Sequence, residues 1–216
     1  GPHGKLLRYS DQNIGGVFHE GQAVCAGYAG AVKYLLDRLG IPCIYVEGYA
    51  VSGDDAGTGH AWNLVKLDGE WYYLDATNGD QPAFLQAEGM DVQPVLFDYL
   101  CPFPEEYERI YRAEEDFALP ETYAVSYNDA VFTGGMFSWY DENDVWDYAV
   151  SVIDQGYSRI RLKFQNAQEY AAACGGLIDG GQIQEIAGYY MDVYGIYEIR
   201  YHYGELEDLN TIYLMF

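Results

Sequence analysis

Basic residues are scarce in this sequence, which has 11 lysines and arginines against 34 aspartates and glutamates and a formal net charge of −23. A surface of this charge repels phosphate backbones and anionic lipid heads, so we expect no nucleic-acid partner. No apolar run is long enough to span a bilayer, and we expect no membrane insertion by this chain. The acidic residues are spread along the chain, which is typical of a solvated surface, with attraction of basic substrates as the alternative.

Cysteine is also infrequent, and its four positions lack the spacing of a metal site. No C-x-x-C pair and no neighbouring histidine pair occurs, so we predict no metal and no cofactor. Cys43 lies in an apolar strand pattern and Cys174 lies among alanines, and both are interpreted as packed thiols. Cys25 is the candidate for chemistry because of its local sequence.

Cys25 lies in the first turn of a predicted helix that runs from about Ala23 to Leu39 and ends at Gly40. The unpaired amides at a helix N-terminus stabilise negative charge, so a cysteine there becomes partly thiolate near neutral pH. The thiolate is the nucleophilic form of the side chain. The sequence therefore predicts a reactive thiol, provided that a base lies close to it.

A base and an acid are predicted to meet in a β-hairpin further along the chain. The apolar and aromatic runs 60–67 and 70–77 flank Asp68-Gly69, a dipeptide that suits a two-residue type I′ turn. Antiparallel pairing from this turn makes His60 and Asp75 diagonal neighbours on one face, with Cβ atoms at most ~7–8 Å apart. A carboxylate bonded to one ring nitrogen would leave the other nitrogen free for a thiol.

Four blocks of the sequence carry a resemblance to a known family, and their order and spacing make it specific: Ala23-Val24-Cys25-Ala26-Gly27-Tyr28-Ala29, Leu39-Gly40-Ile41-Pro42-Cys43, Gly59-His60-Ala61-Trp62-Asn63 and Tyr73-Leu74-Asp75-Ala76-Thr77. Over about residues 20–123 the chain resembles the transglutaminase-like superfamily, which shares the papain-like cysteine-peptidase core. The resemblance implies that Cys25 is the nucleophile, His60 the base and Asp75 the orienting acid.

That family implies thiol-dependent acyl transfer on peptide or glutamine amides through a thioester, with a peptide or protein as the substrate. Resemblance to simple, bacterial-looking members favours a peptidase or amide hydrolase over a cross-linking enzyme. Trp62 is predicted to form a substrate-binding wall near the triad. Gln22 is a candidate second donor to the oxyanion, with a solvent-exposed polar residue as the alternative.

Two further predictions concern the protein in its setting. We expect it to act outside the cell or at its surface, although no signal segment is visible, and a cytoplasmic location stays open. The alternative function is a non-catalytic module that binds peptides or cell-wall material on the same fold. Oligomeric state is not predicted.

The predicted fold class is α+β. Residues 1–120 are predicted to form a transglutaminase-like catalytic domain, with the cysteine helix packed on an antiparallel sheet and an irregular lead in place of the family's upstream helices. Gly1-Pro2 is interpreted as a protease-cleavage scar. Residues 52–59 are predicted to form a loop that could gate the site, and residues 105–117 an acidic helix.

Residues 121–216 are predicted to form a second, small α+β domain of order β-α-β-α-β-β, with its helices on one side of a sheet. No catalytic constellation is found in it. The predicted strands are 123–132, 157–164, 196–203 and 211–216, and the predicted helices are 142–155, 167–178 and 182–194.

Overall fold

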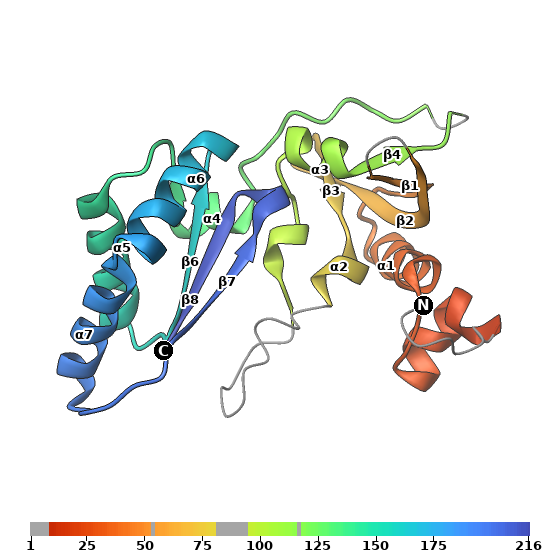
Figure 1. The fold of residues 1–216 in the computed structure, drawn as a ribbon. Coiled ribbons are helices and arrows are strands. Elements are labelled where there is room, and N and C mark those ends of the chain that lie inside the picture. The colour runs from red at the N-terminus through yellow and green to blue at the C-terminus, as the bar shows by residue number, and fades with distance from the viewer. Residues whose placement is uncertain (1–8, 53–54, 81–94, 116–117) are drawn as a thin grey trace. The chain divides into compact units, whose positions relative to one another are not determined.

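The computed structural model describes residues 9–52, 55–80, 95–115 and 118–216. Within these residues the chain forms two compact units, the first ending at Asp129 and the second beginning at Ala130. The sequence places the domain boundary about ten residues earlier, at 120/121. Helices and a mainly antiparallel sheet occur in each unit (Figure 1), so the α+β fold class is confirmed.

The first unit is built on a four-stranded antiparallel sheet of order β3-β2-β1-β4. The helix α1 packs against β1 and β2, and short helical turns surround it. The elements in chain order are η1 (Tyr9–Gln12), η2 (Gly16–Glu20), α1 (Cys25–Leu39), β1 (Cys43–Ser52), β2 (Asp55–Leu67), β3 (Glu70–Leu74), α2 (Ala76–Gly79), η4 (Phe97–Tyr99), α3 (Pro104–Ile110) and β4 (Tyr111–Ala113).

The β2–β3 hairpin has the predicted register. Leu67 pairs with Glu70, and the ladder continues to the pair of Asn63 and Leu74. Asp68 and Gly69 both have positive φ angles, 49° and 92°, as a type I′ turn requires. The turn therefore fixes which side chains of β2 face the end of β3.

The chain before α1 is more regular than predicted, because η1 and η2 both pack against α1. The Val24 amide donates to the Asp11 carbonyl oxygen at 2.8 Å. A Cβ atom at Gly27 would lie 2.9 Å from that same oxygen. Glycine at this position of α1 therefore lets the lead lie directly against the start of the helix.

The side chain of Asn63 links α1 to the sheet through hydrogen bonds. This fully buried side chain extends from β2, and its Nδ2 donates to the Ala29 carbonyl oxygen at 3.0 Å and to the Ile44 carbonyl oxygen at 3.4 Å. Ala29 and Ala31 are buried on the helix side of this contact. Small residues allow the helix to approach the strands closely, which fixes the position of its N-terminal turn.

Two predicted segments of the first unit are wrong. The 52–59 loop is instead the tip of a long β1–β2 hairpin, in which Ser52 pairs with Asp55 and Val51 with Ala56, while residues 53–54 lie outside the described residues. The acidic helix ends at Ile110 rather than 117, and Tyr111–Ala113 forms the edge strand β4 beside β1. Backbone pairing with β1 prevails over the helical pattern here.

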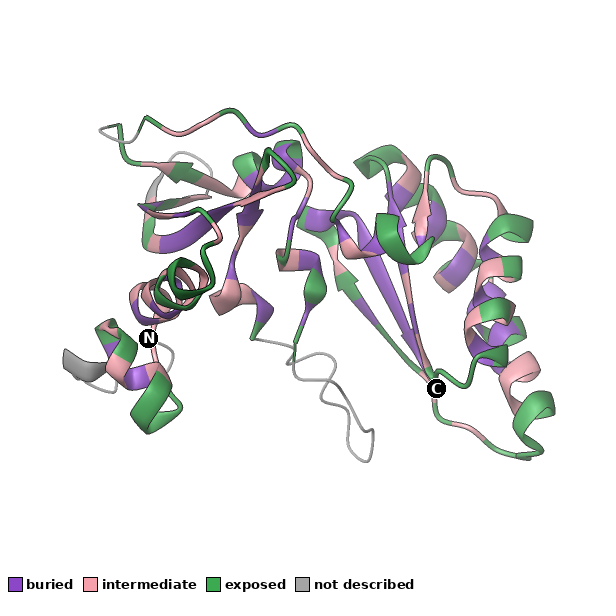
Figure 2. Cartoon of the chain, turned by 180° about the vertical axis from the view of Figure 1, so that it is seen from behind, coloured by how far each residue is buried: buried purple, intermediate pink, exposed green. Residues whose placement is uncertain are grey.

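The second unit is a sheet of order β5-β6-β8-β7 with helices α5, α6 and α7 along one face (Figure 1). Only the β5–β6 pair is parallel within the described chain. Figure 2 shows the buried residues concentrated along the strands and the facing sides of these helices. Its elements are α4 (Asp129–Thr133), β5 (Met136–Phe137), α5 (Glu142–Asp154), β6 (Arg159–Phe164), α6 (Ala167–Cys174), η5 (Gly175–Asp179), α7 (Gln182–Tyr194), β7 (His202–Leu206), η6 (Glu207–Leu209) and β8 (Thr211–Met215).

From residue 142 onward the predicted order of helices and strands is confirmed, but the first predicted strand is wrong and another begins later than predicted. The stretch predicted as a strand over 123–132 contains turns and the start of α4, and the first strand is β5. The strand predicted over 196–203 is β7, which begins only at His202. None of the helices in the described residues has the length and apolar composition that a bilayer span requires.

Candidate active site

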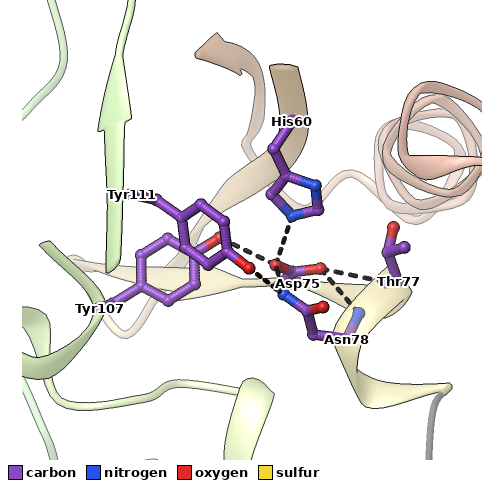
Figure 3. Close-up of polar contacts among 6 residues, drawn as sticks. All are labelled: His60, Asp75, Thr77, Asn78, Tyr107 and Tyr111. Atoms are coloured by element: carbon purple, nitrogen blue, oxygen red, sulfur yellow. Dashed lines mark hydrogen bonds and ion pairs between the residues drawn. The ribbon is translucent and has the colours of Figure 1, made fainter. Parts of the chain in front are cut away.

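His60 and Asp75 meet just beyond the point where the pairing of β2 with β3 ends. The Nε2 atom of His60 lies 2.7 Å from Oδ2 of Asp75, and the two side chains are 11% and 0% exposed (Figure 3). Asp75 follows β3 directly and is the N-cap of α2. The hairpin register and the helix start thus act together to aim this carboxylate at the ring.

Both carboxylate oxygens of Asp75 accept several hydrogen bonds. Its Oδ1 accepts from the backbone amides of Thr77 at 3.1 Å and Asn78 at 3.0 Å, which fixes the carboxylate plane. Its Oδ2 accepts from Asn78 Nδ2 at 2.8 Å and from the Tyr107 hydroxyl at 3.0 Å, in addition to His60 (Figure 3). A buried carboxylate needs such donors to remain charged. The same hydrogen bonds hold the Asp75 side chain in one orientation.

The His60 ring is also held by aromatic side chains. Tyr111, the first residue of β4, stacks on it with 4.6 Å between ring centroids and a 27° angle between planes. Gly48 lies opposite His60 on β1 and opposite Ala113 on β4. A Cβ atom at Gly48 would lie 2.1 Å from the Arg112 carbonyl oxygen and 2.6 Å from the Trp62 ring, so glycine lets β4 approach β1 here. The Tyr111 hydroxyl accepts from Asn78 Nδ2 at 2.7 Å, which joins the stacked ring to the network around Asp75.

Cys25 is the first residue of α1, after an extended Val24. Interaction with the His60 imidazole lowers the pKa of the Cys25 thiol below its ordinary value of 9.0. Partial burial opposes that shift, while the backbone amides of Ala61 and Ala26 favour the charged sulfur. Because Nε2 of His60 faces Asp75, Nδ1 is the ring nitrogen that remains for the sulfur.

The pKa of His60 is shifted in the opposite direction, from 6.5 to about 9. Burial alone would lower it, but hydrogen bonds and charge from Asp75 and Cys25 outweigh the burial. A lowered thiol pKa beside a raised imidazole pKa favours transfer of the thiol proton to the ring. The arrangement can therefore present a charged nucleophile near neutral pH.

The pKa values of the other three thiols, all of them in the described chain, are raised rather than lowered. Burial raises the pKa of Cys43 to about 11 and that of Cys101 to about 12, and it also raises the pKa of Cys174. All four cysteines are free. The cysteines therefore differ sharply in expected reactivity, with Cys25 at the reactive end. In the described residues no group of three or more histidine, cysteine or acidic side chains could hold a metal.

The two residues predicted to contact substrate lie in different surroundings. Trp62 is 1% exposed and packs between His60 and Tyr107, with ring centroids 6.0 Å and 5.9 Å away. Its burial corrects the prediction of an open wall, because a buried indole supports the imidazole from the core and cannot contact a substrate. Gln22 is exposed, three residues before Cys25, and its backbone amide donates to the Gly16 carbonyl oxygen at 3.0 Å.

Three residues around the site are absent from the sequence-based prediction. Tyr107 and Tyr111 come from α3 and β4, in a segment predicted as one solvated acidic helix, and Asn78 lies just after the predicted hairpin. Only Asn78 had a local signal, because an Asp followed three residues later by a side-chain amide is common at helix starts. The two tyrosines depend on tertiary pairing.

Comparison with known proteins shows which family this chain is similar to. Residues 6–76 match the model of the transglutaminase-like superfamily, and this range contains Cys25, His60 and Asp75. The matched residues lie in the first unit, so this unit is similar to a transglutaminase-like core. Two relatives named Kyphoscoliosis peptidase, from Mus musculus and Homo sapiens, are each 38% identical to this chain over 63 residues. The matched stretch is 26% of this chain and spans only 9% of either relative's length.

Proposed function

We propose that this protein is a thiol-dependent acyl-transfer enzyme with Cys25, His60 and Asp75 as its catalytic triad. The observation that carries the proposal is the coupling of Cys25 to His60, with their pKa values shifted in opposite directions and Asp75 at 2.7 Å on the far ring nitrogen. A thiol that serves only to fill the core does not need a histidine and a carboxylate that shift its pKa. The family match and the printed word peptidase in the relatives' name support the same class of chemistry.

In the proposed reaction the Cys25 thiolate attacks the carbonyl carbon of an amide, and the carbonyl oxygen takes up the negative charge. The His60 imidazolium then donates its proton to the departing nitrogen, the C–N bond breaks, and a thioester to Cys25 remains. Neutral His60 next takes a proton from water, whose oxygen attacks the thioester. The acid product leaves, and the proton retained on His60 restores the ion pair.

Asp75 keeps the ring in the productive tautomer and stabilises its charge throughout both steps. Backbone amides in the first turn of α1 favour negative charge at this place, and we assign the oxyanion to the amide of Cys25 with a second donor. Gln22 is the candidate for that donor because it is exposed just before the helix.

Water as the second nucleophile makes the enzyme a peptidase or amide hydrolase, whereas an amine would make it a cross-linking enzyme. We favour hydrolysis. The name of the two relatives, Kyphoscoliosis peptidase, supports this choice.

The test is turnover of a peptide library that includes glutamine-containing peptides, with and without an added primary amine. Wild type should release new carboxylates, Cys25→Ala should release none, and Cys174→Ser, which removes a thiol of the second unit, should behave as wild type. Amine incorporation in place of hydrolysis would change the preferred reaction. Tight peptide binding by wild type without any turnover would favour the binding module instead.

A further inference from the structure

A cavity of about 370 Å³ lies in the first unit beside the candidate triad. Its lining comes from α1, from the end of β3 with α2, and from the segment around η4. Asp75 belongs both to this lining and to the triad. Tyr28, also in the lining, lies three residues after Cys25 and so on the same side of α1, about one turn along. The cavity therefore adjoins the candidate active site through Asp75, while its lining does not include Cys25 or His60.

The walls of the cavity are fixed by backbone hydrogen bonds. The Leu96 amide donates to the Gly79 carbonyl oxygen at 2.7 Å, and the Asp75 amide donates to the Tyr99 carbonyl oxygen at 2.9 Å. Leu74 and Leu100 form a further β-bridge. A ligand would therefore enter a preformed space, which reduces the ordering cost of binding.

The chemistry of the lining is predominantly apolar, and part of it is open to solvent. Val95 is 43% exposed, Phe97 is 38% exposed and Leu100 is 36% exposed, so three large apolar side chains of the lining are partly open to solvent. Pockets of about 300–1,000 Å³ with apolar walls and few polar groups are typical of ligand sites. Exposed apolar groups around such a space gain from covering by an apolar ligand.

The polar groups of the lining define what would be rejected. The Tyr28 hydroxyl donates to Asp80, and burial together with this carboxylate raises the pKa of Tyr28 to about 12, so the phenol stays neutral. Asp80 is then left as an exposed negative charge at the cavity. An acidic ligand group would be repelled here, while an apolar group meets no unpaired partner.

From these observations we infer that the cavity binds a large apolar side chain of the peptide substrate, of leucine, methionine or phenylalanine size, and excludes acidic ones. The inference rests on the proposed function, because it makes the cavity a specificity pocket for the peptide that Cys25 attacks. Binding there would hold the peptide across the N-terminal turn of α1. Phe97 and Val95 are then the residues that determine specificity.

The test uses blocked hexapeptides in which a single leucine is moved through an alanine and glycine background, with alanine or glutamate in its place as comparison. Binding is measured to the Cys25→Ala protein, and turnover is measured with Cys25 present. We expect leucine at one position to bind at least about tenfold more tightly than alanine, and glutamate to bind more weakly than alanine. Phe97→Ala and Val95→Asp should each reduce the leucine preference to less than about threefold.

Leu39→Ala is the matched control, since Leu39 is 73% exposed at the far end of α1 and should keep the full preference. Equal binding of leucine and alanine peptides at every position would overturn the inference, as would a preference that survives in both pocket variants. Turnover separates the two proposals. Peptide cleavage without leucine preference sinks the pocket alone, and leucine-dependent binding without any cleavage sinks the catalytic function alone.

Discussion

Replacing Asp75 by asparagine tests whether Asp75 stabilises the protonated form of His60. The Oδ1 atom accepts two backbone amides, from Thr77 and Asn78, so the amide oxygen of the new side chain should keep that place. Its NH₂ group would then face Nε2 of His60, where Oδ2 now accepts. Two donors cannot face each other, so His60 is expected to leave Nε2 unprotonated and to carry its proton on Nδ1.

The size of the effect follows from the pKa of His60, which is raised from 6.5 to about 9. This rise corresponds to about 3 kcal/mol in favour of the protonated ring. Burial opposes the charge, and it would remain in the variant. We therefore expect the pKa of His60 in Asp75→Asn to fall below 6.5, and the Cys25 thiol to lose the charge that lowers its own pKa.

The assay is a pH titration of the histidine ring protons by NMR, with His60 assigned through a His60→Gln sample. Asp80→Asn serves as the matched control, because this carboxylate is five residues away in sequence and is hydrogen-bonded to Tyr28 instead. The control should titrate as wild type. If His60 in Asp75→Asn still titrates near its wild-type value, Asp75 does not hold the charge on the ring and the reasoning is refuted.

Three other predictions concern stability. Tyr107→Phe keeps the buried ring and removes one donor to Asp75, and it should lower the free energy of urea unfolding by about 1.5–3 kcal/mol, with no measurable loss contradicting the network. Gly48→Ala should cost about 3 kcal/mol or more in the same assay, because its Cβ would lie 2.1 Å from the Arg112 carbonyl oxygen, and a neutral effect would show that β4 is free to move. Since the pKa of His60 is higher in the folded chain, its stabilisation should be full below about pH 6.5 and lost as pH rises through about 9, so that wild type and His60→Gln converge in stability over that window, and a gap that stays constant would contradict the shift.

The part of the site that the sequence predicts is the part fixed by local rules. Asp68-Gly69 dictates a type I′ turn, and that turn sets the register that brings His60 to Asp75. The helix is also predicted locally, from about Ala23 against an observed start at Cys25, and Gly40 ends it as predicted with a φ of 73°. Short-range chemistry is sufficient at these positions.

The remainder depends on contacts that no local pattern contains. Tyr111 is a helical residue by periodicity, but it belongs to a three-residue edge strand that exists only because β1 offers a free edge and Gly48 offers space. Trp62 follows His60 by two positions and lies on the same face of β2. It is nevertheless covered by Tyr107 and other core residues, and the sequence does not show this burial.

Alternation misled the prediction in the segment 123–132 as well. Tyr123 is 76% exposed and Tyr127 is 40% exposed, so these aromatic residues do not form the buried face that the pattern suggests. Tyr127 instead donates to Asp68 at 2.5 Å, at the turn of the β2–β3 hairpin. A strand needs a partner edge as well as a pattern, and within the described chain the sheet of the second unit begins only at Met136.

We propose above all that His60 takes the proton of the Cys25 thiol and stabilises the thiolate. Iodoacetamide labelling at about pH 6, resolved by site with mass spectrometry, tests this most directly. The account predicts that Cys25 is alkylated at least about 100-fold faster than Cys43 or Cys101, and that His60→Ala removes this advantage without changing the other thiols. Equal labelling of the cysteines in wild type, or fast labelling of Cys25 that survives the loss of His60, would contradict it.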